Sequence, residues 1–203
     1  MTTAAHSATP SGATHWRRYR TLYLLIAVCV APVLASYLMY YVFPPSGRTN
    51  YGDLIVPQRP TPELGLRSED GSAYSLGRLR GSWVMLKVDT AACDEACRLQ
   101  LWQMRQLRTM QGKDADRIAR VFMVTDDAPL EMALMREHDG AVVLRADRAE
   151  LERFLPAGKG TRLEDHLFLI DPIGNLMLRW PKDADPNRMK RDIGRLLKAS
   201  RIG

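Results

Sequence analysis

Residues 83–97 read WVMLKVDTAACDEAC, a short apolar run followed closely by two cysteines. The run WVMLKV is typical of a strand in the middle of a sheet, because it is apolar along almost its whole length. A helical pattern starts near Asp94 and places four apolar residues on one face, namely Cys97, Leu101, Met104 and Leu107. Cys93 is therefore expected at the carboxyl end of a central strand, where open α/β sheets tend to place their chemistry.

The segments around this stretch predict alternating strands and helices. LGLRSEDGSAYSL before it reads as a hairpin, and RIARVFMVTDD and AVVLRAD after it read as two further strands, each followed by a helical pattern. HLFLIDPIGNLMLRW predicts two strands across a turn, and DPNRMKRDIGRLLKAS predicts a terminal amphipathic helix. This order predicts a mixed α/β sheet with helices on both faces.

A hydrophobic segment precedes the predicted domain. From Leu22 to Phe43 the chain runs 22 residues without a charge, enough to cross a hydrocarbon core of about 30 Å as a helix. The run is longer than the apolar region of a cleaved signal, and it ends in aromatic residues and prolines, not in small residues. We predict an uncleaved transmembrane anchor over residues 21–43, and Cys29 within it is expected to be a packing residue.

The flanks of the anchor predict its orientation. Three arginines (Arg17, Arg18 and Arg20) lie just before it, whereas only Arg48 lies close behind it. Because cytoplasmic flanks carry the excess of basic residues, residues 1–20 are predicted to be a cytoplasmic tail of a single-pass bacterial inner-membrane protein.

Beyond the anchor, the chain divides into a linker and a domain. Residues 44–63 hold five prolines and show little periodicity, which predicts an extended tether. Residues 64–203 are the predicted domain, on the periplasmic side. Past residue 45 the chain carries 26 basic and 23 acidic side chains, and no basic stripe is interleaved with aromatics, so nucleic acid is not an expected partner.

Cys93 and Cys97 leave several interpretations open. The loop between them is too short for a disulfide to add much stability as a cross-link. The N-terminus of a helix favours a thiolate at Cys93, and Cys97 lies one turn further along the same face. Two such sulfurs can form a disulfide reversibly or bind a soft metal, although two thiolates alone seldom complete a metal site.

A third ligand has to come from the four histidines. His6 and His15 precede the anchor, and a cationic role at the C-terminus of a helix is the simpler expectation for His138. His166 comes directly before a strand that should be central, so it is expected at the rim of the sheet. Together with the two cysteines it makes a soft three-ligand site that suits Cu(I), or Cu(II) with a fourth ligand. Asp165 either orients this imidazole or caps a loop.

From about Leu64 to Ser200 the chain resembles the Sco (SenC-type) proteins, which are membrane-anchored, thioredoxin-fold copper chaperones for assembly of the copper-A centre of cytochrome c oxidase. The resemblance rests on the N-terminal anchor, on LRGSWVMLKVDTAACDEAC with its Cys-x-x-x-Cys, on VFMVTDD, and on DHLFLIDPIGN. It implies a thioredoxin-like sheet and copper ligation by Cys93, Cys97 and His166. It also implies that the partner is the copper-A subunit or another copper-site protein.

The chain also departs from the Sco pattern. Sco proteins typically have proline after the first cysteine, and often after the second, where this chain has Asp94 and Arg98. Asp94 and Glu95 place negative charge beside the thiolates, which tends to raise the thiol pKa values. Thioredoxin-like reductases usually have a cis-proline just before the strand that starts here at Leu167, and its absence favours a metal site.

Three functions follow as hypotheses. The first is a metallochaperone, not an enzyme, that passes copper to an oxidase subunit. The second is a membrane-tethered thiol-disulfide reductase in which Cys93 and Cys97 are the redox-active residues and His166 is incidental. The third is a binding module in which the two cysteines form only a structural disulfide.

Overall fold

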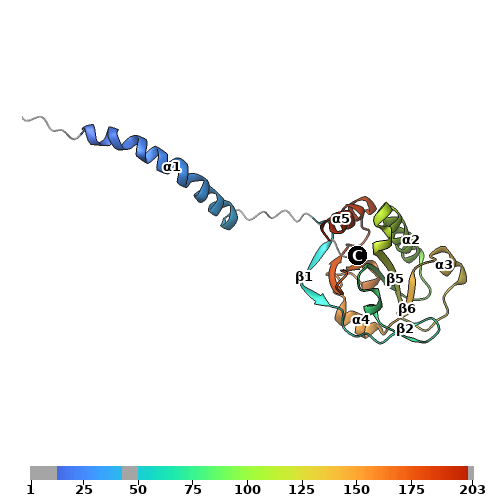
Figure 1. The fold of residues 1–203 in the computed structure, drawn as a ribbon. Helices are drawn as coiled ribbons and strands as arrows, with labels where there is room; N and C mark the ends of the chain where they lie inside the picture. Colours follow the sequence, from blue (N-terminus) through green and yellow to red (C-terminus); the bar gives the residue numbers. More distant parts are fainter. Residues whose placement is uncertain (1–12, 43–49, 201–203) are drawn as a thin grey trace, which may run out of the picture. The chain divides into compact units, whose positions relative to one another are not determined.

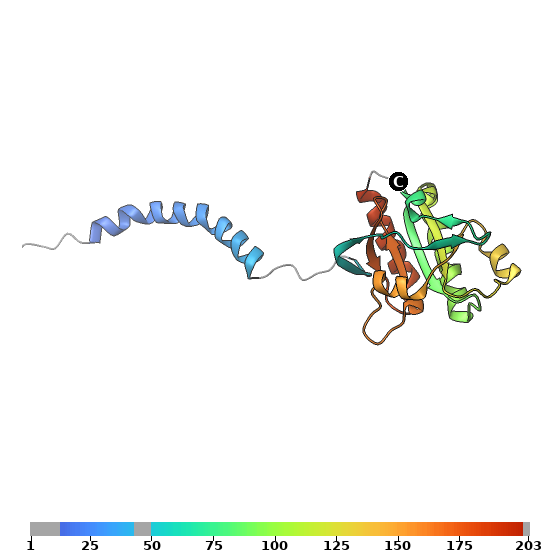
Figure 2. The same ribbon diagram turned by 90° about the horizontal axis from the view of Figure 1, so that it is seen from below.

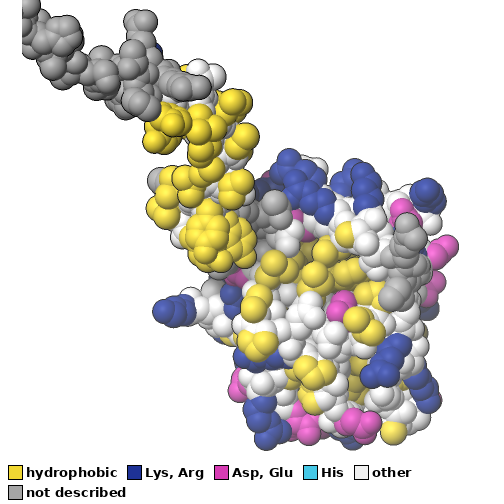
Figure 3. Space-filling view, turned by 60° about the vertical axis from the view of Figure 1, so that its left-hand side comes forward, with side chains coloured by type: hydrophobic (Ala, Val, Ile, Leu, Met, Phe, Trp, Pro, Cys, Tyr) yellow, Lys and Arg dark blue, Asp and Glu magenta, His cyan; other side chains and the backbone are white. Residues whose placement is uncertain are grey.

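The computed structural model describes residues 13–42 and 50–200, which belong to two separate units (Figure 1). In the first unit, helix α1 (Ala13–Tyr41) includes a stretch from Tyr19 to Tyr41 that is long and apolar enough to cross a membrane. Hydrophobic side chains cover the surface of this stretch (Figure 3). The predicted anchor is therefore a single helix up to Tyr41, and Phe43 lies outside the described residues.

The second unit is built on one sheet. The eight strands in the described part of the chain are arranged in the order β1-β8-β7-β4-β5-β6-β2-β3. Their bounds are β1 (Asp53–Pro60), β2 (Leu66–Ser68), β3 (Ala73–Tyr74), β4 (Trp83–Asp89), β5 (Ile118–Val124), β6 (Val142–Arg145), β7 (Leu167–Ile170) and β8 (Asn175–Arg179). β4 pairs with β5 in parallel and with β7 antiparallel, so it lies in the interior of a mixed sheet.

Helices pack on both faces of the sheet (Figure 2). Their bounds are α2 (Glu95–Thr109), α3 (Met132–Glu137), α4 (Arg148–Phe154) and α5 (Pro186–Ala199), with 3₁₀ turns η1 (Leu76–Leu79), η2 (Gly112–Arg117) and η3 (Leu163–Asp165). Residues of α2, α3 and α5 pack into one hydrophobic cluster, and residues of α4, η1 and η3 pack into the other. We call these sides of the sheet the α2 face and the α4 face.

Side-chain alternation along β4 explains why there are two hydrophobic clusters. Trp83 and Met85 belong to the cluster of the α2 face, whereas Val84 and Leu86 belong to that of the α4 face. A strand buried on both sides must be apolar at nearly every position, which is why WVMLKV lacks a polar alternation. The four apolar residues predicted for one face of α2 are all buried. The predicted mixed sheet with helices on both faces is therefore confirmed.

The edge strand β1 lies within residues 44–63, where the sequence predicted only an extended tether. β1 is extended, and it pairs antiparallel with β8, so residues 53–60 belong to the domain. The buried carboxylate of Asp192 in α5 accepts hydrogen bonds from the backbone N–H groups of Tyr51 and Gly52 at 2.9–3.1 Å. A Cβ atom at Gly52 would come within 2.5 Å of the Leu178 side chain, so glycine permits this close approach.

Candidate redox and metal site

The predicted cysteine pair lies at the junction of β4 and α2. Cys93 and Cys97 form a disulfide, with their Cα atoms 5.1 Å apart. Asp94 between them is the N-cap of α2, because its carboxylate accepts a hydrogen bond from the Cys97 N–H at 2.9 Å. The sequence located both the strand end and the helix start within a residue of where they occur.

The loop that carries the cysteines is held in place by several backbone contacts. The Ala91 N–H donates to the Asp126 carboxylate at 3.1 Å, and the Thr125 N–H donates to the Asp89 carbonyl at 2.9 Å. Cys93 adopts a φ of +35°, a region that non-glycine residues rarely occupy and that carries a conformational cost of about 1–3 kcal/mol. The surrounding contacts therefore hold the first cysteine in a strained backbone conformation.

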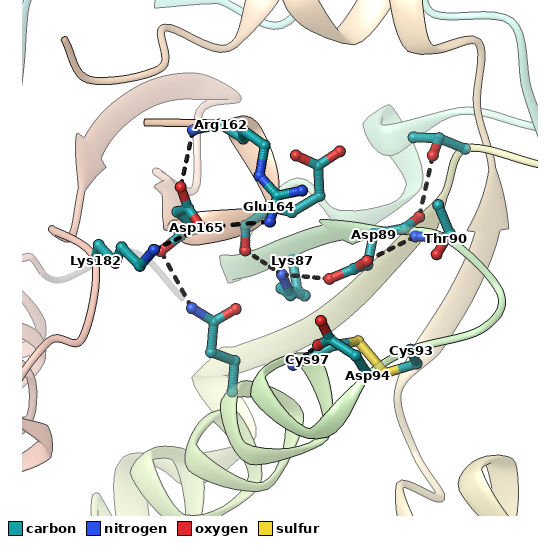
Figure 4. A network of polar contacts seen from close by, with 12 residues as sticks. Lys87, Asp89, Thr90, Cys93, Asp94, Cys97, Arg162, Glu164, Asp165 and Lys182 are labelled. Carbon is teal, nitrogen blue, oxygen red and sulfur yellow. Dashed lines mark hydrogen bonds and ion pairs between the residues drawn. A yellow bond between two sulfur atoms is a disulfide. The ribbon is translucent and has the colours of Figure 1, made fainter. Parts of the chain in front are cut away.

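A buried lysine lies on the same strand. Lys87 of β4 is 0% exposed, and its ammonium group forms an ion pair with the Asp89 carboxylate at 2.9 Å and donates to the Glu164 carbonyl (Figure 4). Burial lowers the pKa of Lys87 by more than the neighbouring Asp89 carboxylate raises it, so the pKa lies below its usual value. Sequence reasoning missed this residue. The feature that could have revealed it is a single charged residue inside an otherwise apolar strand.

A cleft of about 270 Å³ opens beside the disulfide, and we call it the cysteine cleft. Its lining includes Cys97 and Asp89, so one cysteine of the disulfide and one partner of the Lys87–Asp89 ion pair border the same space. The complete lining is Asp89, Thr90, Ala92, Asp94, Ala96, Cys97, Arg148, Arg162, Glu164 and Asp165. Cys93 and Cys97 are each only 1% exposed. The pair is therefore almost completely buried, and Cys97 is the cysteine that borders the cysteine cleft.

His166 is held by hydrogen bonds at both ring nitrogens. Nδ1 lies 2.8 Å from the Trp180 carbonyl, an acceptor, so Nδ1 carries the proton. Nε2 lies 2.7 Å from the Thr161 hydroxyl and accepts a hydrogen bond from the Gly158 N–H at 3.4 Å. Burial lowers the pKa of His166, which agrees with a neutral ring. Neither nitrogen has a lone pair available for a metal in this arrangement.

His166 and the disulfide lie on opposite faces of the sheet. The backbone of His166 is extended and leads directly into β7, so its side chain points the same way as that of Phe168, whose ring it contacts edge-on. Phe168 belongs to the hydrophobic cluster of the α4 face, whereas Cys93 and Cys97 belong to that of the α2 face. The structure therefore brings the two cysteines together but does not bring His166 to them.

The donor set in this oxidised state does not fit a three-ligand copper site. Within residues 13–42 and 50–200, no three side chains of His, Cys, Asp or Glu come close enough to hold a metal ion. Asp165 takes the loop-capping role, because its carboxylate accepts from the Arg162 N–H at 2.9 Å and pairs with Lys182 at 3.5 Å. The second role considered for Asp165, orientation of the imidazole, is not supported, because both ring nitrogens of His166 contact other residues.

Solved structures share this fold. Sco1 from Thermus thermophilus matches with a TM-score of 0.55 and 17% identity, over 76% of this chain and 98% of that one. Copper-bound ScoI from Arabidopsis thaliana matches with a TM-score of 0.54 and 15% identity, over 74% and 99%. A putative protein disulfide isomerase from Bacteroides thetaiotaomicron gives 0.51 and 21%, over 74% and 95%. The predicted resemblance to Sco proteins is thus confirmed at the level of the fold.

Sequence comparison adds a family. No curated protein has a matching sequence. A family model described as "Transmembrane-like, thioredoxin-like, C-terminal domain" matches residues 83–200, which run from β4 through α5 and make up more than half of the chain. The match includes both cysteines and the thioredoxin-like sheet around them. The chain therefore belongs to the family of transmembrane-like, thioredoxin-like C-terminal domains.

Proposed function

We propose that the chain is a membrane-tethered thiol-disulfide reductase whose domain acts on cysteines of an extracytoplasmic protein. The observation that carries the proposal is the cysteine pair itself: it is closed into a disulfide at the start of α2, and Cys97 is one of the residues that line the cysteine cleft. His166 is occupied on the other face of the sheet. Chemistry that needs two cysteines therefore has more structural support than chemistry that needs all three residues.

The reaction balances as a two-electron exchange. In the reduced protein, a thiolate of the cysteine pair attacks a disulfide of the partner, forming a mixed disulfide and releasing one partner thiolate. The second cysteine then attacks the mixed disulfide, which releases the partner as a dithiol and forms the Cys93–Cys97 bond seen here. An upstream dithiol has to reduce this bond before the next cycle. The N-terminus of α2 stabilises the thiolate intermediates.

The expected partner is the copper-A subunit of cytochrome c oxidase or another copper-site protein outside the cytoplasm. This part of the proposal rests on the Sco resemblance, since copper-bound Sco structures share the fold. A protein that keeps such a subunit's cysteines reduced would prepare them to accept copper. The anchor helix and the arginines before it support a place in the bacterial inner membrane, with the domain on the periplasmic side.

Copper transport is the second candidate, with copper as cargo. The supporting observation is that the two sulfurs are adjacent, which suits Cu(I) once the disulfide is reduced. For His166 to be the third ligand, its ring has to give up the hydrogen bonds to Thr161 and Trp180. The three-residue site of Cys93, Cys97 and His166 is thus a proposal that requires a rearrangement.

An anaerobic Cu(I) titration of the full chain separates the two candidates. If the cysteine pair acts alone, His166→Ala leaves the Cu(I) affinity of the reduced protein unchanged. A weakening of about 10-fold or more would instead support the three-ligand site. Thr161→Val is the matched control, because it removes one partner of the ring and leaves the imidazole in place.

Thiol trapping in cells tests the reductase directly. We expect the cysteine pair to be found partly reduced, and Cys93→Ser or Cys97→Ser to leave the partner's cysteines oxidised. Finding the pair permanently oxidised in wild-type cells would overturn both redox and copper functions, and would leave a structural disulfide.

A further inference from the structure

A second cavity lies away from the cysteine cleft, between α2, α3 and strands β5 and β6. Its volume is about 130 Å³, and we call it the His138 cavity. Apolar side chains form most of its wall, namely Leu101, Phe122, Leu130, Leu134, Met135 and Val143. The remaining lining is His138 with residues 139–141 that follow it. His138 is therefore the buried polar side chain of a mostly apolar lining, whereas the exposed Asp139 carboxylate accepts a hydrogen bond from the Gly140 N–H.

The imidazole of His138 has no hydrogen-bond partner within the described residues. Its ring nitrogens are both buried and unpaired, and the residue is 6% exposed. A buried polar group without a partner costs about 1–3 kcal/mol, and most such groups in proteins are satisfied. The missing partner of His138 is therefore expected to come from outside the chain.

The arginines around His138 disfavour a cation as that partner. Burial lowers the pKa of His138, and the positive charges of Arg120, Arg105 and Arg98 lower it further, opposed only by Glu137. The sequence-based expectation of a cationic imidazole at the end of α3 is thus not supported. The same positive field disfavours a metal ion, even though Met135 offers a thioether nearby. A neutral imidazole presents one donor and one acceptor nitrogen.

The size and walls of the cavity restrict the partner further. An engineered protein cavity of about 150 Å³ holds a benzene molecule, so a single six-membered aromatic ring matches the His138 cavity. Apolar walls disfavour a charged group. A hydroxyl group on the ring both donates and accepts, which complements the two kinds of nitrogen on the neutral imidazole.

We propose that the His138 cavity binds a neutral phenolic ring whose hydroxyl group forms a hydrogen bond with the His138 imidazole. This site is separate from the cysteine pair and does not depend on the proposed reductase function. Leu101, which lines the cavity from α2, is one turn after Cys97 on the same helix face. The phenolic ring comes from a free small molecule or from a tyrosine side chain of a protein partner.

The test uses the full chain in lipid nanodiscs, labelled with ¹⁵N-histidine, and 4-methylphenol as the probe. Equilibrium dialysis fixes the free concentration of the probe, because phenols also enter lipid. We expect a saturable shift of the His138 ring signals with a dissociation constant of about 1 mM, as suits so small a ligand. Toluene has the same shape without the hydroxyl group, and it should bind about 10-fold more weakly.

Two variants keep the test decisive. His138→Leu removes the two unpaired nitrogens, so it should fold. This variant should bind toluene at least as well as 4-methylphenol. The loss of ¹⁹F signal from fluorinated forms of the two ligands measures their binding. Ala141→Phe fills the cavity and should abolish binding of both probes. Binding of N-acetyltyrosinamide to the wild-type chain would identify a partner's tyrosine as the source, and its exclusion would identify a free phenol.

Two results would overturn the proposal. The first is the absence of a saturable His138 shift up to about 20 mM free 4-methylphenol, far above the expected constant, which would leave only water beside the imidazole. The second is equal affinity of the wild-type chain for toluene and 4-methylphenol, which would show that the cavity selects shape alone.

Discussion

Among single residues, Lys87 shows most directly how the cysteine site is built. An ammonium group in a central strand is stable only if its charge is compensated, and Asp89 provides that charge two residues later on the same side of the strand. Glu164 adds a carbonyl from the neighbouring loop. The Lys87 ammonium group therefore ties the end of β4 to the loop before β7, and these two segments form walls of the cysteine cleft.

Breaking this ion pair is predicted to be costly. Lys87→Met leaves the Asp89 carboxylate beside the core without its cation, and the free energy of unfolding should fall by about 3 kcal/mol. Urea denaturation of the reduced and oxidised chain measures this change. Adding Asp89→Asn to Lys87→Met should recover part of the loss, because it removes the uncompensated charge.

Lys182→Met is the matched control for that experiment. Lys182 pairs with Asp165, but its side chain is 56% exposed, so solvent screens the pair and its loss should cost less than about 1 kcal/mol. Equal effects of the Lys87 and Lys182 substitutions would contradict a special role for the buried pair.

The buried histidines predict that acid destabilises the domain. Burial lowers the pKa of His166 and of His138 below the unfolded value of 6.5. The folded state thus favours the neutral rings, so this contribution to stability is complete above the unfolded pKa and is lost as pH falls through the folded pKa. The free energy of unfolding should decrease as the pH falls below about 6.5.

His166→Gln isolates the contribution of one ring. The glutamine amide retains a donor and an acceptor for Trp180 and Thr161 but does not titrate in this range. Chemical denaturation at several pH values should give a shallower pH dependence for His166→Gln than for the wild-type chain. An unchanged slope would mean that other groups cause the acid sensitivity.

The sequence predicted the cysteine pair correctly because its evidence is local. Only three residues separate Cys93 from Cys97, and Cys93 lies just before the N-cap of α2 while Cys97 lies in its first turn, so the short spacing brings them together. The position of His166 depends instead on the strand register. Its place next to β7 was predicted, but the direction of its side chain follows from alternation that starts at Phe168, and no short-range pattern around "DHLF" specifies the face.

Among the elements, β1 is the one for which the sequence prediction differed most from the structure. Five prolines and little alternation in residues 44–63 predicted a linker, yet proline is compatible with an edge strand. What makes this segment a strand is its contact with distant residues: β8 beside it and Asp192 in α5. Hairpins such as β2–β3 and β7–β8 were predicted because their turn signals lie within the segment itself.

Two chains, one beginning at residue 50 and one at residue 64, should differ measurably in their stability. A chain that begins at residue 64, the predicted domain boundary, lacks β1. It also lacks the N–H groups of Tyr51 and Gly52, which donate hydrogen bonds to the Asp192 carboxylate. Its free energy of unfolding should be lower, by at least about 3 kcal/mol, than that of a chain that begins at residue 50. Thermal or urea denaturation of the two chains tests this.

A substitution serves as the control for that truncation. Asp192→Asn in the longer chain weakens the same hydrogen bonds without removing β1, so it should reproduce part of the loss. Equal stability of the chains starting at residues 50 and 64 would show that β1 does not stabilise the domain and acts only as part of the tether.

At the scale of the whole molecule, the anchor and the domain make separate demands on the sequence. The helix needs only length and apolar composition, which the segment Tyr19–Tyr41 meets. The domain needs strands that are far apart in the sequence to pair with one another, and its fold was predicted from the order of the predicted elements. Reductase function requires in addition that the cysteines face an oxidising compartment, where partner disulfides form. Orientation in the membrane is thus the link between the two parts.

Orientation is predicted from the arginines that flank the anchor. With Arg17, Arg18 and Arg20 before the helix, alkaline phosphatase fused after residue 200 should be active, because that enzyme needs the disulfide-forming periplasm. Replacing these three arginines with glutamate and adding three lysines after Phe43 should lower the activity severalfold, since the positive charge then lies on the other side. Adding the lysines while keeping the arginines controls for the insertion itself. An inactive fusion in the unaltered chain would place the cysteine pair in the reducing cytoplasm and contradict both the predicted orientation and the proposed partner.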